Sequence, residues 1–337
     1  IIGASGYVGA ELVSLLCNHD KISVMHLLVS ENSEASGQMI SELHPKLHSV
    51  CDLPLTAFTV NWFNQNIDSI DAIFFATPHE FSAAWAGEFL QAGKQVFDLS
   101  GGFRLKSPAL YPQYYGFTHQ NESLLSSAVY GLADWFAKEI THARLIAVPG
   151  CYPTASLTAL KPVVEHSLVE EHGLIVVNGI SGVSGAGRKA SLATSFNEVS
   201  LTPYNILQHR HQPEISQEAN AQVVFNPHLA PFKRGLLATV TLQLKSGVTH
   251  QDIASAYSNA YQDKPLVRLK SAPPKIDDVV HTPFADLYSQ YDEKTGVLTA
   301  CCAIDNLLKG AASQAVQCAN LTLSLPSEYG LIAGALK

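Results

Sequence analysis

A glycine-rich turn, Gly3–Gly9, limits the possible folds of this chain more than any other feature. The apolar pair Ile1-Ile2 leads into Gly3-Ala-Ser-Gly6-Tyr-Val-Gly9, and Ala10–Leu16 then carries apolar residues at helical spacing. A turn between strand and helix lets backbone N–H groups approach a pyrophosphate at the positive end of the helix. The spacing is GxxGxxG rather than GxGxxG, so by itself the turn also fits an ordinary tight connection.

The second predicted strand, Val24–Val29, bears on the choice of dinucleotide. It ends in Ser30-Glu31-Asn32-Ser33, about 20 residues past the glycines, where the ribose of a bound nucleotide is expected. An acidic side chain there binds a 2′-hydroxyl, whereas short polar side chains leave room for a 2′-phosphate. Ser30 and Ser33 therefore favour NADP, and Glu31 is the residue that argues for NAD.

Strands and helices alternate through the first third of the chain. Strands are predicted at Asp71–Ala76 and Gln95–Leu99 with a helix over Glu80–Ala92, which indicates a parallel sheet with crossover helices. Ligands bind at the carboxyl ends of such strands, so Thr77 and Ser100 are candidate contacts. Arg104 could bind an anionic substrate through two hydrogen bonds, although the Pro and Gly residues of these loops fit plain turns equally well.

Cys151 is the candidate nucleophile. A strand is predicted at Leu145–Val148 and a helix at Ala155–Leu160, with Pro149-Gly-Cys-Tyr-Pro-Thr154 between them. At a helix N-terminus the dipole and the free N–H groups stabilise a thiolate. The alternative is a small buried side chain, and the other five cysteines have no comparable setting.

His211 is the candidate acid–base partner that such a thiol requires. Pro213 is predicted to open a helix running through Ile215 and Ala219, which places His211 just before the first turn. A capping or surface role is the alternative for this histidine. His209 and His211 have no cysteine or carboxylate pattern to complete a tetrahedral set, so no metal is expected.

Composition excludes several classes of function. The 21 basic and 29 acidic residues are scattered and give a net charge of −8, which leaves no footprint for nucleic acid. With 47% hydrophobic and 15% charged residues the chain is globular, and no apolar run approaches the roughly 18 residues of a membrane span. Six dispersed cysteines without a CxxC pair or a secretory leader favour a reducing, cytoplasmic setting.

Taken together and in order, the motifs resemble those of the N-acetyl-γ-glutamyl-phosphate reductase family, relatives of the aspartate-semialdehyde and glyceraldehyde-3-phosphate dehydrogenases. Pro149-Gly-Cys-Tyr-Pro-Thr154 is the most specific, because the aspartate-semialdehyde branch typically has Cys-Asn-Pro-Thr. The other matching segments are Gly3–Gly9, Asp98–Arg104, Tyr130–Leu132, Ser181–Arg188, His209–Ile215 and Asn306–Ala312. Gly102 and Asp134 depart from residues common in that family.

The resemblance implies an α/β fold with a Rossmann dinucleotide-binding domain over 1–150 and 305–337. It also implies an α+β catalytic and oligomerisation domain with a mixed sheet over 151–304, and a homo-oligomer, either dimer or tetramer. Thr239–Leu244 and Val297–Ile304 are predicted strands of that sheet, and a long helix is predicted from Asp305. The glycines of the Gly182–Gly187 loop could form an anion-binding nest, or a plain surface loop.

The resemblance also implies roles for individual residues. Cys151 is the nucleophile and His211 the acid–base group, and substrate contacts lie near Arg104 and Glu214. Independently of the resemblance, Arg234 is a further candidate for neutralising the substrate's carboxylate or phosphate. Cofactor contacts are expected, in addition to Ser30, Ser33 and Ser100, at Gly3, Ser5, Gly6, Tyr7, Val8, Gly9, Thr77, Gly182, Ser184, Gly185 and Asn306.

The reaction implied is attack of the Cys151 thiolate on an acyl phosphate, loss of phosphate, and reduction of the thioester by NADPH to an aldehyde, in arginine biosynthesis. Aspartyl phosphate and aminoadipyl phosphate are alternative substrates. The aminoadipyl chain is one methylene longer than the glutamyl chain, and one methylene is worth only about 1–3 kcal/mol in a pocket. A cysteine hydrolase with a merely structural glycine turn, and a cofactor sensor without catalysis, are alternatives from other classes.

Overall fold

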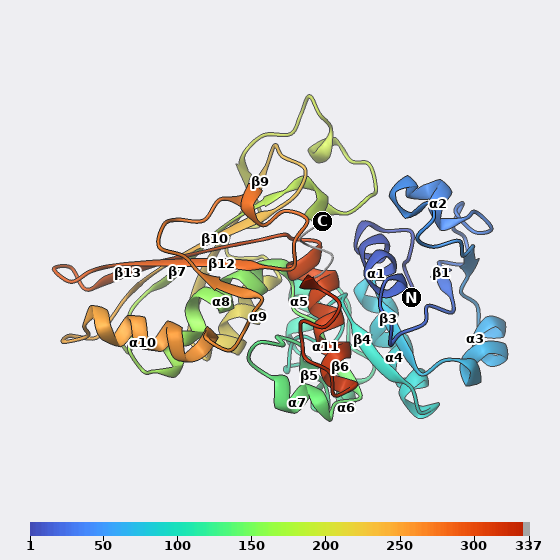
Figure 1. The fold of residues 1–337 in the computed structure, drawn as a ribbon, viewed down its shortest axis with the longest axis horizontal. Helices are drawn as coiled ribbons and strands as arrows, with labels where there is room; N and C mark the ends of the chain where they lie inside the picture. The colour runs from blue at the N-terminus through green and yellow to red at the C-terminus, as the bar shows by residue number, and fades with distance from the viewer. Residues whose placement is uncertain (333–337) are drawn as a thin grey trace. The chain divides into compact units, whose positions relative to one another are not determined.

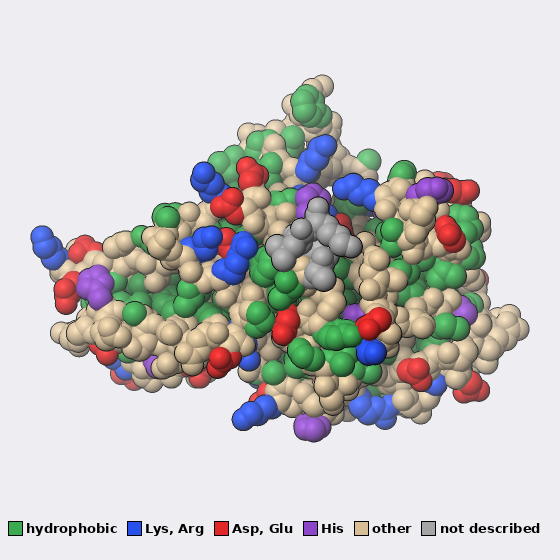
Figure 2. Space-filling view, viewed as in Figure 1, with side chains coloured by type: hydrophobic (Ala, Val, Ile, Leu, Met, Phe, Trp, Pro, Cys, Tyr) green, Lys and Arg blue, Asp and Glu red, His purple; other side chains and the backbone are tan. Residues whose placement is uncertain are grey.

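The computed structural model describes residues 1–332 and consists of two compact units. The first contains residues 1–150 and the segment from Ala311 onward, and the second contains Cys151–Gly310. The last five positions of the expected domain segment 305–337 lie outside the described residues. Within residues 1–332 no helix combines the length and apolarity needed to cross a membrane. On the face drawn in Figure 2, Lys and Arg side chains are interspersed with Asp and Glu side chains.

The first unit is built on parallel strands, as predicted. Four strands pair in the order β3-β4-β6-β5, and β1 pairs with β2. Ile2 forms parallel bridges to Leu28 of β1 and to Phe75 of β3. These strands are β1 (Leu27–Val29), β2 (Leu55–Ala57), β3 (Ala72–Phe75), β4 (Gln95–Asp98), β5 (Val129–Tyr130) and β6 (Leu145–Ala147). The predicted strand Val24–Val29 is shorter than expected, and Ile1-Ile2 contributes only the bridges of Ile2.

Helices connect these strands (Figure 1). The helices predicted after the glycine turn and over Glu80–Ala92 are confirmed as α1 and α4. The helices of this unit are α1 (Tyr7–Cys17), α2 (Ile40–Leu43), α3 (Val60–Asn66), α4 (His79–Gln91), α5 (Leu110–Tyr115), α6 (Glu122–Leu125), α7 (Ala137–Thr141) and α11 (Ser313–Thr322), with 3-10 turns η1 (Pro45–Leu47) and η2 (Ile67–Ser69).

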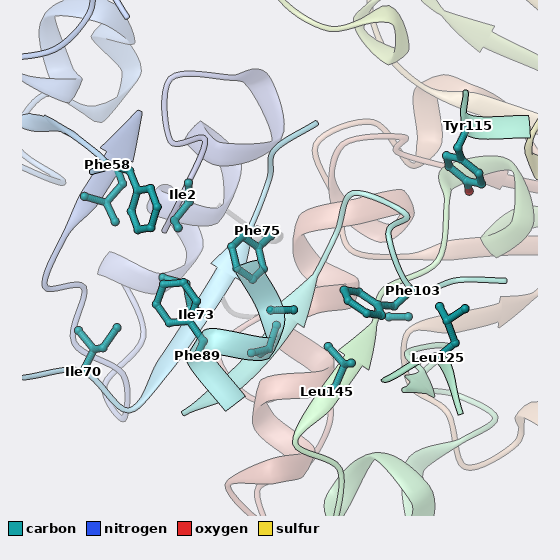
Figure 3. Packing of buried hydrophobic residues seen from close by; sticks show 14 of the residues in the cluster. Ile2, Phe58, Ile70, Ile73, Phe75, Phe89, Phe103, Tyr115, Leu125 and Leu145 are labelled. Carbon is teal, nitrogen blue, oxygen red and sulfur yellow. The ribbon is translucent and has the colours of Figure 1, made fainter. Parts of the chain in front are cut away.

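An apolar cluster holds the strands and helices of this unit together (Figure 3). Phe75 of β3 is fully buried and packs edge-on against Phe89 of α4, with ring centroids 5.6 Å apart. Phe103 and Leu145 belong to the same cluster. Burying such side chains contributes about 1.5–3 kcal/mol each, so the carboxyl ends of the strands and the loops that follow them are held firmly.

The second unit contains a seven-stranded mixed sheet, which confirms the predicted sheet type. The strand order is β11-β12-β13-β10-β7-β9-β8; the pairs β11·β12 and β7·β9 are parallel and the others antiparallel. The strands are β7 (Ile175–Gly182), β8 (Thr202–Pro203), β9 (Val223–Ala230), β10 (Leu236–Gln243), β11 (Val267–Leu269), β12 (Ala285–Asp292) and β13 (Val297–Ile304). The predicted strand Val297–Ile304 coincides with β13.

Three helices, α8 (Cys151–Glu165), α9 (His211–Ala219) and α10 (His250–Tyr261), accompany this sheet (Figure 1). α8 packs against β10 and β13, and both α9 and α10 pack against α8. The hydroxyl groups of Tyr257 and Tyr261 donate to the Ala159 and Thr158 carbonyls at 2.8 and 2.7 Å. Short 3-10 helices are η3 (Val183–Ala186), η4 (Leu192–Thr194) and η5 (Ile276–Asp278). α8 is therefore fixed between the sheet and two helices.

Candidate active site

Cys151 is the first residue of α8, and its side chain is half-buried. The residues from Tyr152 to Val163 are buried, and Lys161 donates to Glu165 Oε1 at 2.8 Å and to the Glu218 carbonyl at 3.1 Å. The thiol therefore sits at the N-terminus of a rigid helix. The helix dipole and the first-turn N–H groups favour a thiolate there.

A π-helical segment, η6 (Leu308–Ala312), lies against Cys151. A Cβ atom added to Gly310 would lie 2.7 Å from the Cβ atom of Cys151 and 3.1 Å from its Cα atom. The Gly310 N–H donates to the Asp305 carbonyl at 2.9 Å. The continuous helix predicted from Asp305 is wrong in this respect, because the chain first forms η6 and becomes α-helical only at Ser313. Glycine is thus the residue that lets this backbone reach the thiol.

His211 is the first residue of α9, not the residue before its first turn as predicted. Pro213 therefore lies inside the first turn, where the N–H group that proline lacks would have no partner within the helix. His211 is buried, and its ring centroid lies 5.9 Å from that of Tyr152, the residue after Cys151. The structure brings the predicted thiol and histidine to one region of the second unit.

His209 supports the backbone of His211. The His211 N–H donates to His209 Nδ1 at 3.1 Å, and the two rings lie 4.7 Å apart. Burial, together with the charge of Arg210, lowers the pKa of His209 to about 3. His209 is therefore uncharged at physiological pH.

Tyr204 lies beside these groups, and sequence reasoning assigned it no role. Its ring is 5.4 Å from that of His209. Burial raises the pKa of Tyr204, so the phenol is protonated at neutral pH. Tyr204 reaches this place because β8 pairs with β9 and its own N–H donates to the Pro227 carbonyl at 3.1 Å. No motif marks it in the sequence.

Asp305 orients the predicted substrate residue Arg234. Its Oδ2 atom accepts a hydrogen bond from Arg234 Nε, and also from the His281 N–H at 2.6 Å. Its Oδ1 atom accepts the N–H groups of Leu307 and Leu308 at 2.8 and 2.9 Å. Asp305 is fully buried. Through these hydrogen bonds it connects Arg234 to the start of η6. Glu214, the other substrate residue predicted in this unit, is also fully buried.

Asn306 and Ser184, both predicted cofactor residues, are hydrogen-bonded to each other. Asn306 Nδ2 donates to Ser184 Oγ at 3.0 Å, and Asn306 Oδ1 accepts the Gly235 N–H at 2.7 Å. The Gly182, Val183 and Ser184 N–H groups donate to the carbonyls of Gly235, Phe232 and Lys233, and the Gly187 N–H to that of Ser184. These four donors are committed within the protein. Contacts of Gly182 and Ser184 with a cofactor would need other atoms than these N–H groups.

The glycine turn of the first unit fits the phosphate group of a dinucleotide. Gly3 has φ +86°, and a Cβ atom there would lie 2.1 Å from the Ala76 carbonyl oxygen. A Cβ atom at Gly9 would lie 2.3 Å from the Gly3 carbonyl oxygen, whereas one at Gly6 would meet only that oxygen, at 3.5 Å. Gly6 is the N-cap of α1 and supplies no side-chain cap, so the first-turn N–H groups remain available to an anion. The protein therefore leaves room beside the Cα atom of Gly6, where a phosphate group could approach the backbone.

The remaining predicted residues of the first unit lie at or after strand ends. The Thr77 hydroxyl is buried without a hydrogen-bond partner among residues 1–332, as expected of a group that contacts a ligand. Ser100 Oγ is hydrogen-bonded to Asp98 and Ser82. Ser30 is exposed, whereas Ser33 is half-buried and its Oγ accepts the Ala35 N–H. Of the turn residues, Ser5 and Val8 are half-buried and Tyr7 is exposed.

Arg104 is buried and held by backbone carbonyls. Its Nε and Nη2 atoms donate to the Val148 and Leu99 carbonyls, both at 2.8 Å. Gly102 is explained by packing, because a Cβ atom there would lie 2.4 Å from Ser82 Oγ. Asp134 accepts a hydrogen bond from Gln317 at 3.4 Å, so this departure from the family pattern has a structural partner.

Gln314 of α11 is a further candidate that sequence reasoning passed over. It is fully buried, and neither its amide nitrogen nor its amide oxygen has a hydrogen-bond partner within the described part of the chain. Such a side chain is suited to an amide-bearing ligand. As for metal ions, residues 1–332 contain no cluster of three His, Cys, Asp or Glu side chains placed to hold one.

Comparison with known proteins gives a consistent result. Residues 1–143 match the family described as semialdehyde dehydrogenase, NAD binding domain, and residues 151–306 match its dimerisation domain. A protein of Alteromonas mediterranea is 51% identical over 98% of both chains and is named N-acetyl-gamma-glutamyl-phosphate reductase. Proteins of Yersinia pseudotuberculosis and Salmonella typhi with the same name are 50% and 49% identical, again over 98% of both chains.

Solved structures share the fold at lower identity. Aspartate semialdehyde dehydrogenase II of Vibrio cholerae superposes with a TM-score of 0.70 at 19% identity, covering 96% of this chain and 97% of that one. The Candida albicans aspartate semialdehyde dehydrogenase, determined with NADP, gives a TM-score of 0.67 at 13% identity over 95% of this chain and 96% of that one. The chain belongs to the semialdehyde dehydrogenase family, and within it to the group of N-acetyl-γ-glutamyl-phosphate reductases.

Proposed function

We propose that this protein reduces N-acetyl-γ-glutamyl phosphate to N-acetylglutamate semialdehyde and phosphate, with NADPH as reductant, as a step of arginine biosynthesis. The observation that carries the proposal is that Cys151 begins α8 and His211 begins α9, two helices that pack against each other. The ring of His211 contacts that of Tyr152, the residue after Cys151. The relatives of that name, about half identical over nearly all of this chain, support the choice of substrate.

In this mechanism the Cys151 thiolate attacks the acyl carbon, phosphate leaves, and a thioester remains on the enzyme. Forming a thioester replaces one difficult reduction by two easier steps. His211, as imidazolium, stabilises the thiolate and donates a proton to the substrate oxygen. NADPH, when bound, would supply the hydride that reduces the thioester, and breakage of the carbon–sulfur bond would then release the aldehyde and return the Cys151 thiol.

The substrate's anionic groups are assigned to arginine side chains. Arg234 is oriented by Asp305 in the second unit, and Arg104 is held by two backbone carbonyls in the first. A planar guanidinium is suited to binding a carboxylate or a phosphate. Glu214 is proposed as a further substrate contact on α9.

The phosphates of the cofactor are assigned to the unit that carries the glycine turn. Gly3, Ser5, Gly6, Tyr7, Val8 and Gly9 would hold its phosphates, with Ser30 and Ser33 toward a 2′-phosphate and Thr77, Ser100, Gly182, Ser184, Gly185 and Asn306 as further contacts. Residues 1–150 with 305–337 then form the dinucleotide-binding domain, and 151–304 the catalytic domain. We place the enzyme in the cytoplasm, as a homo-oligomer formed through the second domain.

The reverse reaction tests this proposal. N-acetylglutamate semialdehyde, NADP and inorganic phosphate should yield NADPH, and leaving out phosphate should abolish the reaction. Aspartate semialdehyde and the aminoadipate homologue serve as controls for chain length. Faster turnover of either control would move the substrate assignment, and hydrolysis of acyl esters without NADPH binding would indicate a cysteine hydrolase instead.

A further inference from the structure

His209 is placed to control the orientation of His211. Its Nδ1 atom accepts the backbone N–H of His211 at 3.1 Å, which is the N–H of the first residue of α9. An acceptor two residues upstream fixes a turn in the way that Asn and Asp side chains do. The proton of the neutral ring must then be on Nε2, because Nδ1 is the acceptor.

The surroundings hold the His209 ring in place. It is buried and makes edge contacts with Tyr152, Tyr204 and Phe225, with ring centroids 5.9, 5.4 and 5.3 Å away. Tyr152 directly follows Cys151 and also contacts His211, with centroids 5.9 Å apart. Tyr152, which follows the thiol, therefore belongs to the same aromatic cluster as His209 and His211.

Among residues 1–332, His19 and His119 make the same contact, which shows that it is a local structural device. The Lys21 N–H donates to His19 Nδ1, and the Asn121 N–H donates to His119 Nδ1, both at 3.2 Å. In those two cases the other ring nitrogen is hydrogen-bonded to Asn320 Oδ1 and to the Gly102 carbonyl. The residues anchored by His19 and His119 are Lys21 and Asn121, whereas the residue anchored by His209 is His211, to which the mechanism assigns proton transfer.

We propose that His209 is a positioning residue that fixes His211 at the start of α9 and takes no part in proton transfer itself. The inference rests on the proposed function, in which His211 acts on the Cys151 thiol. Without the anchor the first turn of α9 can fray, and displacement of a catalytic group by about 1 Å can cost about 100-fold in rate.

Two substitutions separate positioning from bulk. His209→Asn retains a side-chain acceptor for the N–H two residues on, whereas His209→Leu fills similar space without an acceptor. We expect His209→Leu to lower kcat at least about tenfold with little change in KM, and His209→Asn to restore most of it. If the leucine variant does not fold, His209→Gln replaces it, because its amide is one bond too far to make the turn.

A second measurement does not depend on turnover. The rate of Cys151 alkylation against pH reports the thiolate stabilised by His211, and its midpoint should move to higher pH in His209→Leu but not in His209→Asn. His19→Leu is the matched control, since it removes the same kind of contact in the first unit and should leave that profile unchanged.

Equal kcat and equal alkylation profiles in wild type and His209→Leu would overturn the proposal. So would an asparagine variant as impaired as the leucine variant. If the wild-type protein lacks reductase activity, the proposed function fails, while the alkylation profiles still decide whether His209 positions His211.

Discussion

Cys151 differs from the other cysteines in what surrounds it. Cys318 is buried and its thiol donates to the Gly131 carbonyl, and Cys302 is buried in β13. Cys151→Ser should abolish reductase activity while NADPH still binds, because the hydroxyl is a far weaker nucleophile at neutral pH. Cys301→Ser, at a half-buried site on β13, is the control and should stay active. Steady-state rates and NADPH fluorescence titration would measure both, and an active Cys151→Ser would end the thioester mechanism.

His209 also predicts how stability depends on pH. Its pKa is lowered from 6.5 to about 3 in the folded protein, so between these values the unfolded chain binds a proton that the folded chain does not. The contribution of His209 to the free energy of unfolding is then fully present above pH 6.5. It declines as the pH falls toward 3, by at most about 1.4 kcal/mol per pH unit. Urea unfolding of His209→Asn should therefore show a shallower decline between pH 6 and 4, roughly by that amount. Identical slopes would contradict the assigned pKa.

At the scale of elements, η6 sets the position of α8's first residue. Gly310→Ala would place a Cβ atom 2.7 Å from that of Cys151, so backbone must shift on one side or the other. We expect a loss of about 1–3 kcal/mol in the free energy of unfolding, as for overpacked cores, together with a lower kcat and normal NADPH binding. Gly87→Ala is the control, because its Cβ atom would meet Leu124 at an ordinary 3.6 Å. Full activity of Gly310→Ala would show that the thiol tolerates movement.

Substitutions at two glycines of the turn are expected to affect different properties, one the stability of the fold and the other cofactor binding. Gly9→Ala would clash with the Gly3 carbonyl and should lower the melting temperature. Gly6→Ala meets only that carbonyl, at 3.5 Å, so the fold should persist while NADPH binding weakens at least about tenfold, since the new methyl group occupies the approach of the phosphates. Thermal melts and fluorescence titrations distinguish the two effects. Unchanged NADPH affinity in Gly6→Ala would remove this turn from the cofactor site.

Most regular elements could be predicted because each leaves a local pattern. The glycine turn and helical spacing indicated α1, and apolar runs indicated β3, β4, β6 and β13. The start of α9 at His211 was missed because proline is compatible with any position of the first turn. The π-helical turn was missed because its residues have ordinary helical spacing, and the close approach of Gly310 to Cys151 joins residues far apart in sequence.

At the scale of the whole molecule, the chain leaves the first unit at Gly150 and returns at Ala311. Sequence motifs could identify Cys151 and the histidine segment, because each motif lies within a few residues. Tyr204 and Gln314 could not be identified, since the pairing of β8 with β9 brings Tyr204 beside His209, and Gln314 is distinguished only by a buried amide without a hydrogen-bond partner among residues 1–332.

The central claim is that Cys151 forms a thioester with the acyl group while phosphate leaves. The most direct test mixes the protein with N-acetyl-γ-glutamyl phosphate in the absence of NADPH, and measures released phosphate and the mass of the Cys151 peptide. The account predicts a burst of one phosphate per active site, with an acyl group on Cys151 that is lost on adding NADPH. Absence of the adduct with steady phosphate release, or an adduct on another cysteine, would contradict it.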